Sequence, residues 1–125
     1  MGYGPTILVV DDEPPLRELI RVSLGDRFAF TEAGDADEAW AEAQSHRPDL
    51  VVLDVMLPGR SGLELLRQLK SDAELARVPV VVLSAWQTDE DARDALAAGA
   101  DAFFPKPFAP DELARVVGVL LEDSA

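Results

Sequence analysis

The stretch Leu50–Asp54 constrains the fold more than any other, because it is an uninterrupted apolar run that ends on a carboxylate. Four consecutive leucine and valine residues have no polar face, so both faces of the strand they form must be buried, as in a parallel sheet. Pro58 and Gly59 follow shortly afterwards and require the chain to turn. A single aspartate after a strand usually caps the following turn, so the role of Asp54 depends on what other strands bring to it.

Apolar runs and amphipathic segments alternate along the whole chain. Strands are expected at residues 7–10, 27–33, 50–54, 78–83 and 102–104, and helices at about 14–24, 36–45, 61–71, 89–98 and 110–122. Short connections between strands and helices favour right-handed crossovers and therefore a parallel sheet. The expected fold class is α/β, a doubly wound sheet of five parallel strands with helices on both faces.

Length, charge and cysteine content limit the classes of function. A chain of 125 residues fits one domain, residues 1–125, with a core of about residues 6–122. Its 11 basic and 24 acidic side chains give a net charge of -13, so direct nucleic-acid binding by this domain is not expected. The absence of cysteine excludes disulfides, thiolate zinc sites and a cysteine nucleophile. Without a signal-peptide pattern or a run of membrane-spanning length, a cytoplasmic location with no membrane attachment is expected.

Polar residues stand where four of the expected strands end. The first strand is followed by Asp11 and Asp12, the third ends on Asp54, the fourth on Ser84, and the fifth leads to Lys106. Each has an ordinary explanation as a cap, a turn residue or a surface lysine. The carboxyl ends of parallel strands meet at one edge of the sheet, where ligands bind in such folds. We therefore expect these side chains to form one cluster.

The charges of this cluster indicate its chemistry. Two carboxylates about 4 Å apart repel by roughly 4 kcal/mol at an effective dielectric of 20, so the cluster needs cations. Lys106 supplies one. A hard divalent ion with oxygen ligands supplies the rest, and Mg2+ fits better than zinc in a chain with no cysteine and a single histidine, His46. A carboxylate beside Mg2+, an ammonium and a hydroxyl is suited to accept a phosphoryl group, with Mg2+, Lys106 and Ser84 each facing one equatorial oxygen.

At these residues the sequence resembles a response-regulator receiver domain of two-component signalling, over residues 7 to about 122. The motifs that carry the resemblance are residues 9–13 (VVDDE), 54–58 (DVMLP) with Gly62, 83–85 (LSA) and 99–101 (GAD) leading to 106–108 (KPF). The resemblance implies a strand order of 2-1-3-4-5 and a cis peptide bond between Lys106 and Pro107.

The resemblance also implies a role for each site residue. Asp54 is the phosphoacceptor, and Lys106 and Ser84 assist it. Asp12, Asp54 and the main-chain carbonyl of Met56 bind Mg2+, for which Mn2+ is a substitute, and Asp11 acts through a metal-bound water. Ser84 and Phe103 form the switch. Phosphorylation then changes the face formed by the fourth helix, fifth strand and fifth helix, where Val119 lies off the main apolar stripe.

Residues beside the expected phosphoryl site show departures and open points. Ser84 stands where the family more often has threonine. Small Ala85 leaves the approach to Asp54 open. The resemblance implies that Met56 and Trp86 flank the path of the water that hydrolyses the acyl phosphate, and neither has a charge to orient that water. Slow self-dephosphorylation is therefore expected, although loop packing explains Trp86 equally well. His46, after the second helix, suits a helix C-terminus better than a metal site.

Partners follow from the resemblance. They are a sensor histidine kinase or histidine phosphotransfer protein, a downstream effector domain or protein, and a second copy of the chain through the fourth helix, fifth strand and fifth helix. Such a domain is not a conventional enzyme, although it catalyses its own phosphorylation and dephosphorylation. The alternative is a degenerate receiver that binds proteins without being phosphorylated. A P-loop nucleotidase is excluded because the G-x-x-x-x-G-K-[ST] motif is missing.

Overall fold

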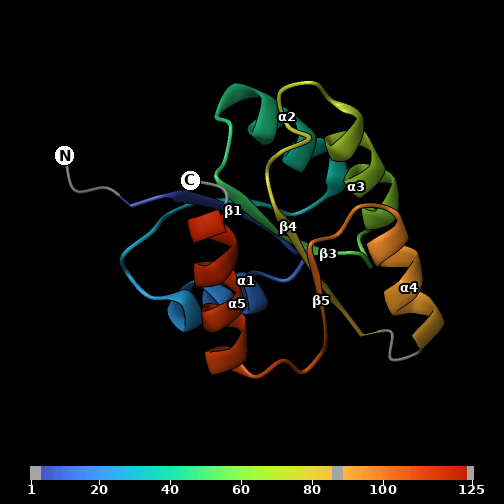
Figure 1. Cartoon of the computed structure of the whole chain (residues 1–125). Helices are drawn as coiled ribbons and strands as arrows, with labels where there is room; N and C mark the ends of the chain where they lie inside the picture. Colours follow the sequence, from blue (N-terminus) through green and yellow to red (C-terminus); the bar gives the residue numbers. More distant parts are fainter. Residues whose placement is uncertain (1–3, 86–88, 124–125) are drawn as a thin grey trace.

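Strands and helices alternate strictly along the chain in the computed structural model, which describes residues 4–85 and 89–123 (Figure 1). The strands are β1 (Thr6–Val10), β2 (Ala29–Ala33), β3 (Leu50–Asp54), β4 (Val80–Ser84) and β5 (Ala102–Pro105). The helices are α1 (Pro14–Leu24), α2 (Ala36–Ser45), α3 (Gly62–Ser71), α4 (Asp89–Ala97) and α5 (Pro110–Asp123). The expected alternation is confirmed.

The five strands form one parallel sheet in the order β2-β1-β3-β4-β5. This confirms the predicted α/β class and strand order. The register aligns the carboxyl ends of the central strands, because Val10 lies opposite Leu53, and Asp54 lies opposite Leu83. The residues that end β1, β3, β4 and β5 therefore meet along one edge of the sheet.

Alternation of side chains along each strand divides the core into two layers. Ile7, Val9 and Leu50 face α1 and α5. They form one core layer with Leu113 and Val117 of α5. The side chains between them on β1 and β3 face α2, α3 and α4, which cover the other side of the sheet in Figure 1. Every residue of β3 and β4 is buried. Burial on both faces explains why these strands are continuous apolar runs.

Two strands begin later than the sequence pattern predicted. β2 begins at Ala29 rather than at residue 27. β4 begins at Val80 rather than at residue 78, because the Val78 amide donates to the carbonyl oxygen of Leu75 at 3.0 Å and Pro79 has no amide hydrogen. Apolar residues thus continue beyond the ladder at this end of the sheet, where hydrophobicity alone does not mark the strand boundary.

Local capping explains several helix ends. The side chain of Asp35 accepts a hydrogen bond from the Glu38 amide at 2.8 Å and caps α2. The α1 helix has Glu13 at its N-cap without a side-chain cap bond, and prolines occupy its first turn. Asp12 is therefore not a helix cap. Gly25, with φ 89°, ends α1 in a conformation that favours glycine.

Gly62, the first residue of α3, allows this helix to approach the end of β3 closely. A Cβ atom at this position would lie 2.5 Å from the Val55 Cα and 2.7 Å from the Asp54 carbonyl oxygen. The Gly62 amide instead donates to the carbonyl oxygen of Val55 at 3.0 Å. Gly62 therefore packs against the backbone of Asp54 and Val55. This backbone cannot shift without also moving the Asp54 side chain.

We predict that Gly62→Ala destabilises the fold by about 1–3 kcal/mol, because the new methyl group overpacks the backbone at Val55. Gly118→Ala is the matched control, since nothing lies within 4 Å of a Cβ built on that α5 residue. It should stabilise the fold by about 0.5–1 kcal/mol through helix propensity. Urea unfolding of the two variants measures both effects, and equal free energies of unfolding would contradict the packing argument.

Candidate phosphoryl-acceptor site

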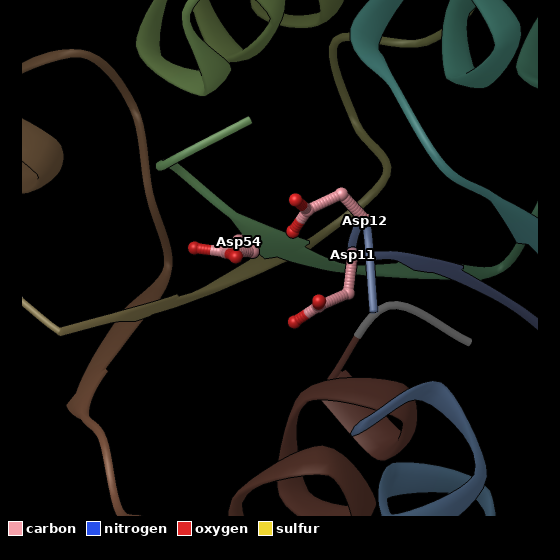
Figure 2. A group of neighbouring side chains, drawn as sticks. All are labelled: Asp11, Asp12 and Asp54. Carbon is pink, nitrogen blue, oxygen red and sulfur yellow. The ribbon is translucent and has the colours of Figure 1, made fainter. Parts of the chain in front are cut away.

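Three aspartates gather at the carboxyl ends of β1 and β3 (Figure 2). Asp11 and Asp12 directly follow β1, and Asp54 is the last residue of β3. Each offers a carboxylate oxygen, and these oxygens all lie within 4.8 Å of one another. Asp11 and Asp54 are buried, whereas Asp12 is exposed. The cluster predicted from the strand ends is therefore present, and it opens to solvent on the Asp12 side.

Lys106 joins this cluster from the loop after β5. Its Nζ atom lies 3.0 Å from a carboxylate oxygen of Asp11 and 3.1 Å from one of Asp54. The Lys106 amide donates to the carbonyl oxygen of Ser84 at 2.7 Å, which fixes the loop after β5 against the end of β4. One ammonium thus links residues that are 95 and 52 positions away in the sequence.

Asp54 is held by its own strand-end geometry. One carboxylate oxygen accepts a hydrogen bond from the Met56 amide at 3.0 Å, and the other accepts from Lys106. Only 4% of the residue is exposed. The Val55 amide donates to the Leu83 carbonyl oxygen at 3.3 Å, so β3 and β4 remain paired just beyond the carboxylate. The carboxylate orientation is consequently fixed from both sides.

Burial and the neighbouring charges act in opposite directions on the ionisation of the site. Burial raises the pKa of Asp54 above its usual value, and the Met56 amide and Lys106 ammonium lower it without cancelling that effect. Burial alone lowers the pKa of Lys106, but its hydrogen bonds and ion pairs with Asp11 and Asp54 together outweigh burial and raise it. Lys106 therefore stays charged at neutral pH, while the ionised form of Asp54 is costly when no metal is present.

The donor set fits a hard divalent cation. Three carboxylates face one lysine, and within residues 4–85 and 89–123 no Lys, Arg or His pairs with Asp12. Oxygen ligands without sulfur or imidazole are those that Mg2+ prefers. Because Asp12 is exposed, an ion held there would be accessible to solvent or substrate.

The other residues singled out in the sequence lie in different surroundings. Ser84 is fully buried at the end of β4, and Ala85 beside it is exposed. Met56 is 49% exposed. Phe103 is partly buried against the core under α2, α3 and α4. Trp86 lies outside the described residues.

Three further expectations concern residues outside the acidic cluster. The Lys106–Pro107 peptide bond is cis, as the resemblance implied. His46 is the exposed C-cap residue of α2, and its Nδ1 lies 3.1 Å from a carboxylate oxygen of Glu42 in that helix, which agrees with a surface role at the end of α2. Val119 is 44% exposed on α5.

One residue of the site went unnoticed in the sequence. The Arg17 guanidinium donates to the carbonyl oxygen of Asp11 at 2.6 Å and to Glu32 at 2.8 Å. The two partners lie 6 and 15 positions from Arg17 in the sequence, and neither spacing corresponds to a local helix motif. A weak signal exists, since an arginine close to a helix N-terminus is disfavoured by the helix dipole and so points to a specific acceptor.

The site geometry agrees with the comparison to known families. The model for the response regulator receiver domain matches residues 7–118. The chain belongs to this family. The matched family is a signalling family of two-component systems and not a classical enzyme family.

Two curated relatives of this receiver domain are named as transcriptional regulatory proteins. It is 44% identical over 119 residues to the phosphate regulon transcriptional regulatory protein PhoB of Pseudomonas aeruginosa, covering 94% of this chain and 52% of that protein. It is 44% identical over 121 residues to the probable transcriptional regulatory protein TcrX of Mycobacterium tuberculosis, covering 96% of this chain and 51% of that protein. The chain thus spans about half the length of these relatives.

A solved structure shares the fold closely. The receiver domain of the Francisella response regulator 1452 superposes with a TM-score of 0.90 at 30% identity, covering 98% of this chain and 100% of that one.

Within the part of the chain that the structure describes, none of the helices has the length and apolarity needed to cross a membrane.

We predict that Asp54→Asn stabilises the metal-free protein at pH 7 by an amount on the order of 1 kcal/mol, because it removes one of the buried, mutually repelling charges. The folded-state pKa of Asp54 is raised, so the wild type loses stability as pH rises from the usual aspartate value through the raised one. The gain from Asn should therefore be larger at pH 7 than at about pH 3.5, where it should largely vanish.

Urea unfolding in EDTA across this pH range measures the gain. Asp37→Asn is the matched control, because the Asp37 side chain is 88% exposed and its pair with Arg60 lies on the surface. A loss of stability in Asp54→Asn at pH 7 would show that the Lys106 ion pair outweighs the burial of this carboxylate.

Proposed function

We propose that this receiver domain is a phosphorylation-dependent switch in which Asp54 accepts a phosphoryl group with Mg2+ present. The observation that carries the proposal is the buried carboxylate of Asp54, which lies 3.1 Å from the Lys106 ammonium and beside the carboxylates of Asp11 and Asp12 at the carboxyl ends of the strands. Such an arrangement has charges for binding a metal and an anion together. The proposal takes residues 1–125 as one receiver domain in the cytoplasm, with a core of about residues 6–122.

In the proposed metal site, Asp12, Asp54 and the main-chain carbonyl of Met56 would hold Mg2+, or Mn2+ in its place, and Asp11 would act through a bound water. When bound, the ion supplies positive charge that offsets the carboxylates and stabilises charge on the transferred group. Lys106 stays protonated between Asp11 and Asp54 and faces the incoming phosphoryl oxygens. Ser84 offers a hydroxyl at the end of the neighbouring strand.

In the transfer step, a carboxylate oxygen of Asp54 attacks the phosphorus atom of a phosphohistidine. An O–P bond forms while the N–P bond breaks, and the bonding electrons return to the imidazole nitrogen, which is then protonated from solvent. The product is an acyl phosphate on Asp54 and a free histidine on the donor. Because the donor supplies the whole phosphoryl group, the reaction balances without another reactant.

The proposed output is a change in the face formed by α4, β5 and α5. A phosphoryl group on Asp54 would attract the Ser84 hydroxyl and leave space that Phe103 can enter. Support for a docking role of this face comes from Leu96 of α4 and Val119 of α5, which are 51% and 44% exposed. The partners proposed are a sensor histidine kinase or phosphotransfer protein, an effector, and a second copy of the chain.

A degenerate receiver that works without phosphorylation is not favoured. In such a protein the acceptor or its assisting groups would be replaced. Here Asp11, Asp12, Asp54, Ser84 and Lys106 are all present at the same edge of the sheet.

Incubation with acetyl phosphate tests the function directly. We expect intact-mass measurement to show one added phosphoryl group with Mg2+ and none with EDTA, because the carboxylates repel a phosphate when no metal is bound. Asp54→Asn should abolish the gain. Asp37→Asn, a surface carboxylate, should leave it unchanged. No gain in the wild type would support the degenerate receiver, and a gain that persists in Asp54→Asn would place the acceptor elsewhere.

A second prediction concerns the switch. Phe103 has no hydroxyl to desolvate, so its ring should turn inward readily and become more buried when beryllofluoride and Mg2+ occupy the site. Crystal structures of the free and beryllofluoride-bound forms give the χ1 angle of this ring. The same outward orientation in both forms would rule out this ring as the switch element.

A further inference from the structure

Arg17 connects the acidic loop after β1 to the edge strand of the sheet. Its Nη1 donates to the carbonyl oxygen of Asp11 at 2.6 Å, and its Nε donates to Glu32 of β2 at 2.8 Å. The Arg17 side chain is only 18% exposed. Glu32 also pairs with Arg21 at 3.2 Å, so the acceptor for Arg17 is itself fixed by a second cation. Two N–H groups of the guanidinium thus bind two different acceptors at once, in the fixed fork geometry that lysine lacks.

The bond from Arg17 completes the fixation of Asp11. The Asp11 amide donates to the carbonyl oxygen of Ala33 in β2 at 3.1 Å. One carboxylate oxygen accepts from the Glu13 amide at 2.9 Å and the other from Lys106 at 3.0 Å. With the carbonyl held by Arg17, every polar atom of Asp11 has a partner. This carbonyl belongs to the peptide bond between Asp11 and Asp12. Its hydrogen bond with Arg17 therefore fixes the backbone position of Asp12.

We propose that Arg17 is a positioning residue for the metal-binding loop, acting through the Asp11 carbonyl and anchored by Glu32. This inference rests on the proposed function for the role of Mg2+. Groups that orient metal ligands affect metal affinity without touching the ion. Arg17 therefore sets the Mg2+ concentration at which Asp54 becomes competent to accept a phosphoryl group.

Positioning and charge predict opposite effects of removing Arg17. The guanidinium is a cation close to a site for another cation, so its removal should strengthen Mg2+ binding if only its charge matters. If it positions the loop, removal should weaken Mg2+ binding because Asp11 and Asp12 become mobile. The sign of the change in affinity thus separates the two roles.

The experiment compares Arg17→Gln with Arg21→Gln, which removes the same charge from the same helix and also breaks a pair with Glu32. Mg2+ affinity is measured by calorimetry at constant ionic strength. We expect Arg17→Gln to weaken it about tenfold, and Arg21→Gln to change it less than about twofold. Arg17→Lys, which keeps the charge but reaches one acceptor at a time, should give an intermediate loss and serves if Arg17→Gln does not fold.

Two further readouts separate positioning from general destabilisation. The Mg2+ concentration for half-maximal phosphorylation by acetyl phosphate should rise in Arg17→Gln, while the rate at saturating Mg2+ stays within about twofold of the wild type. A smaller folded fraction would instead lower the rate at every Mg2+ concentration. In metal-free protein, hydrogen exchange at the Glu13 amide, which donates to Asp11, should be faster in Arg17→Gln than in Arg21→Gln.

Equal changes in Arg17→Gln and Arg21→Gln, or tighter Mg2+ binding in Arg17→Gln, would overturn the inference while leaving the proposed function intact. A wild type that neither binds Mg2+ nor accepts a phosphoryl group would overturn the proposed function and this role of Arg17 together.

Discussion

The ammonium of Lys106 is the interaction on which the site depends. It lies 3.0 Å from Asp11 and 3.1 Å from Asp54, two buried carboxylates that would otherwise repel each other at short range. Asp12 adds a third carboxylate to the cluster, so the single ammonium offsets only one of three negative charges. The cluster is therefore partly neutralised without metal, and the negative charge that remains favours a divalent cation. One lysine thus accounts for both properties.

The parallel sheet makes this interaction available. Its register brings the ends of β1, β3, β4 and β5 to one edge, and burial on both faces fixes the ends of β3 and β4. Close packing at Gly62 presses α3 against the backbone beside Asp54. The Arg17–Glu32 pair extends the support to the edge strand β2. The site residues therefore lie at strand ends and in the loops that follow them, while the rigidity that the site requires comes from the strands.

Much of this arrangement could be predicted from the sequence. Uninterrupted runs such as Leu50–Asp54 require burial on both faces, and the polar residue after each run then falls at a known edge. The starts of strands were predicted less well. Val78 is apolar and was expected in β4, but its amide donates to the Leu75 carbonyl oxygen and the strand begins at Val80. The contact of Arg17 with the Asp11 carbonyl could not be predicted, since it depends on side-chain direction and on Glu32 from another strand. Periodicity defines which residues are buried and leaves such partners undetermined.

The central claim is that Asp54, among three neighbouring carboxylates, is the one that becomes phosphorylated. The most direct measurement is reductive trapping of the acyl phosphate with borohydride, followed by mass-spectrometric sequencing of the peptides. Reduction converts a phosphorylated aspartate to homoserine and leaves free carboxylates unchanged. We expect homoserine at position 54 and aspartate at positions 11 and 12. Homoserine at position 11 or 12, or at none of the three, would contradict the central claim.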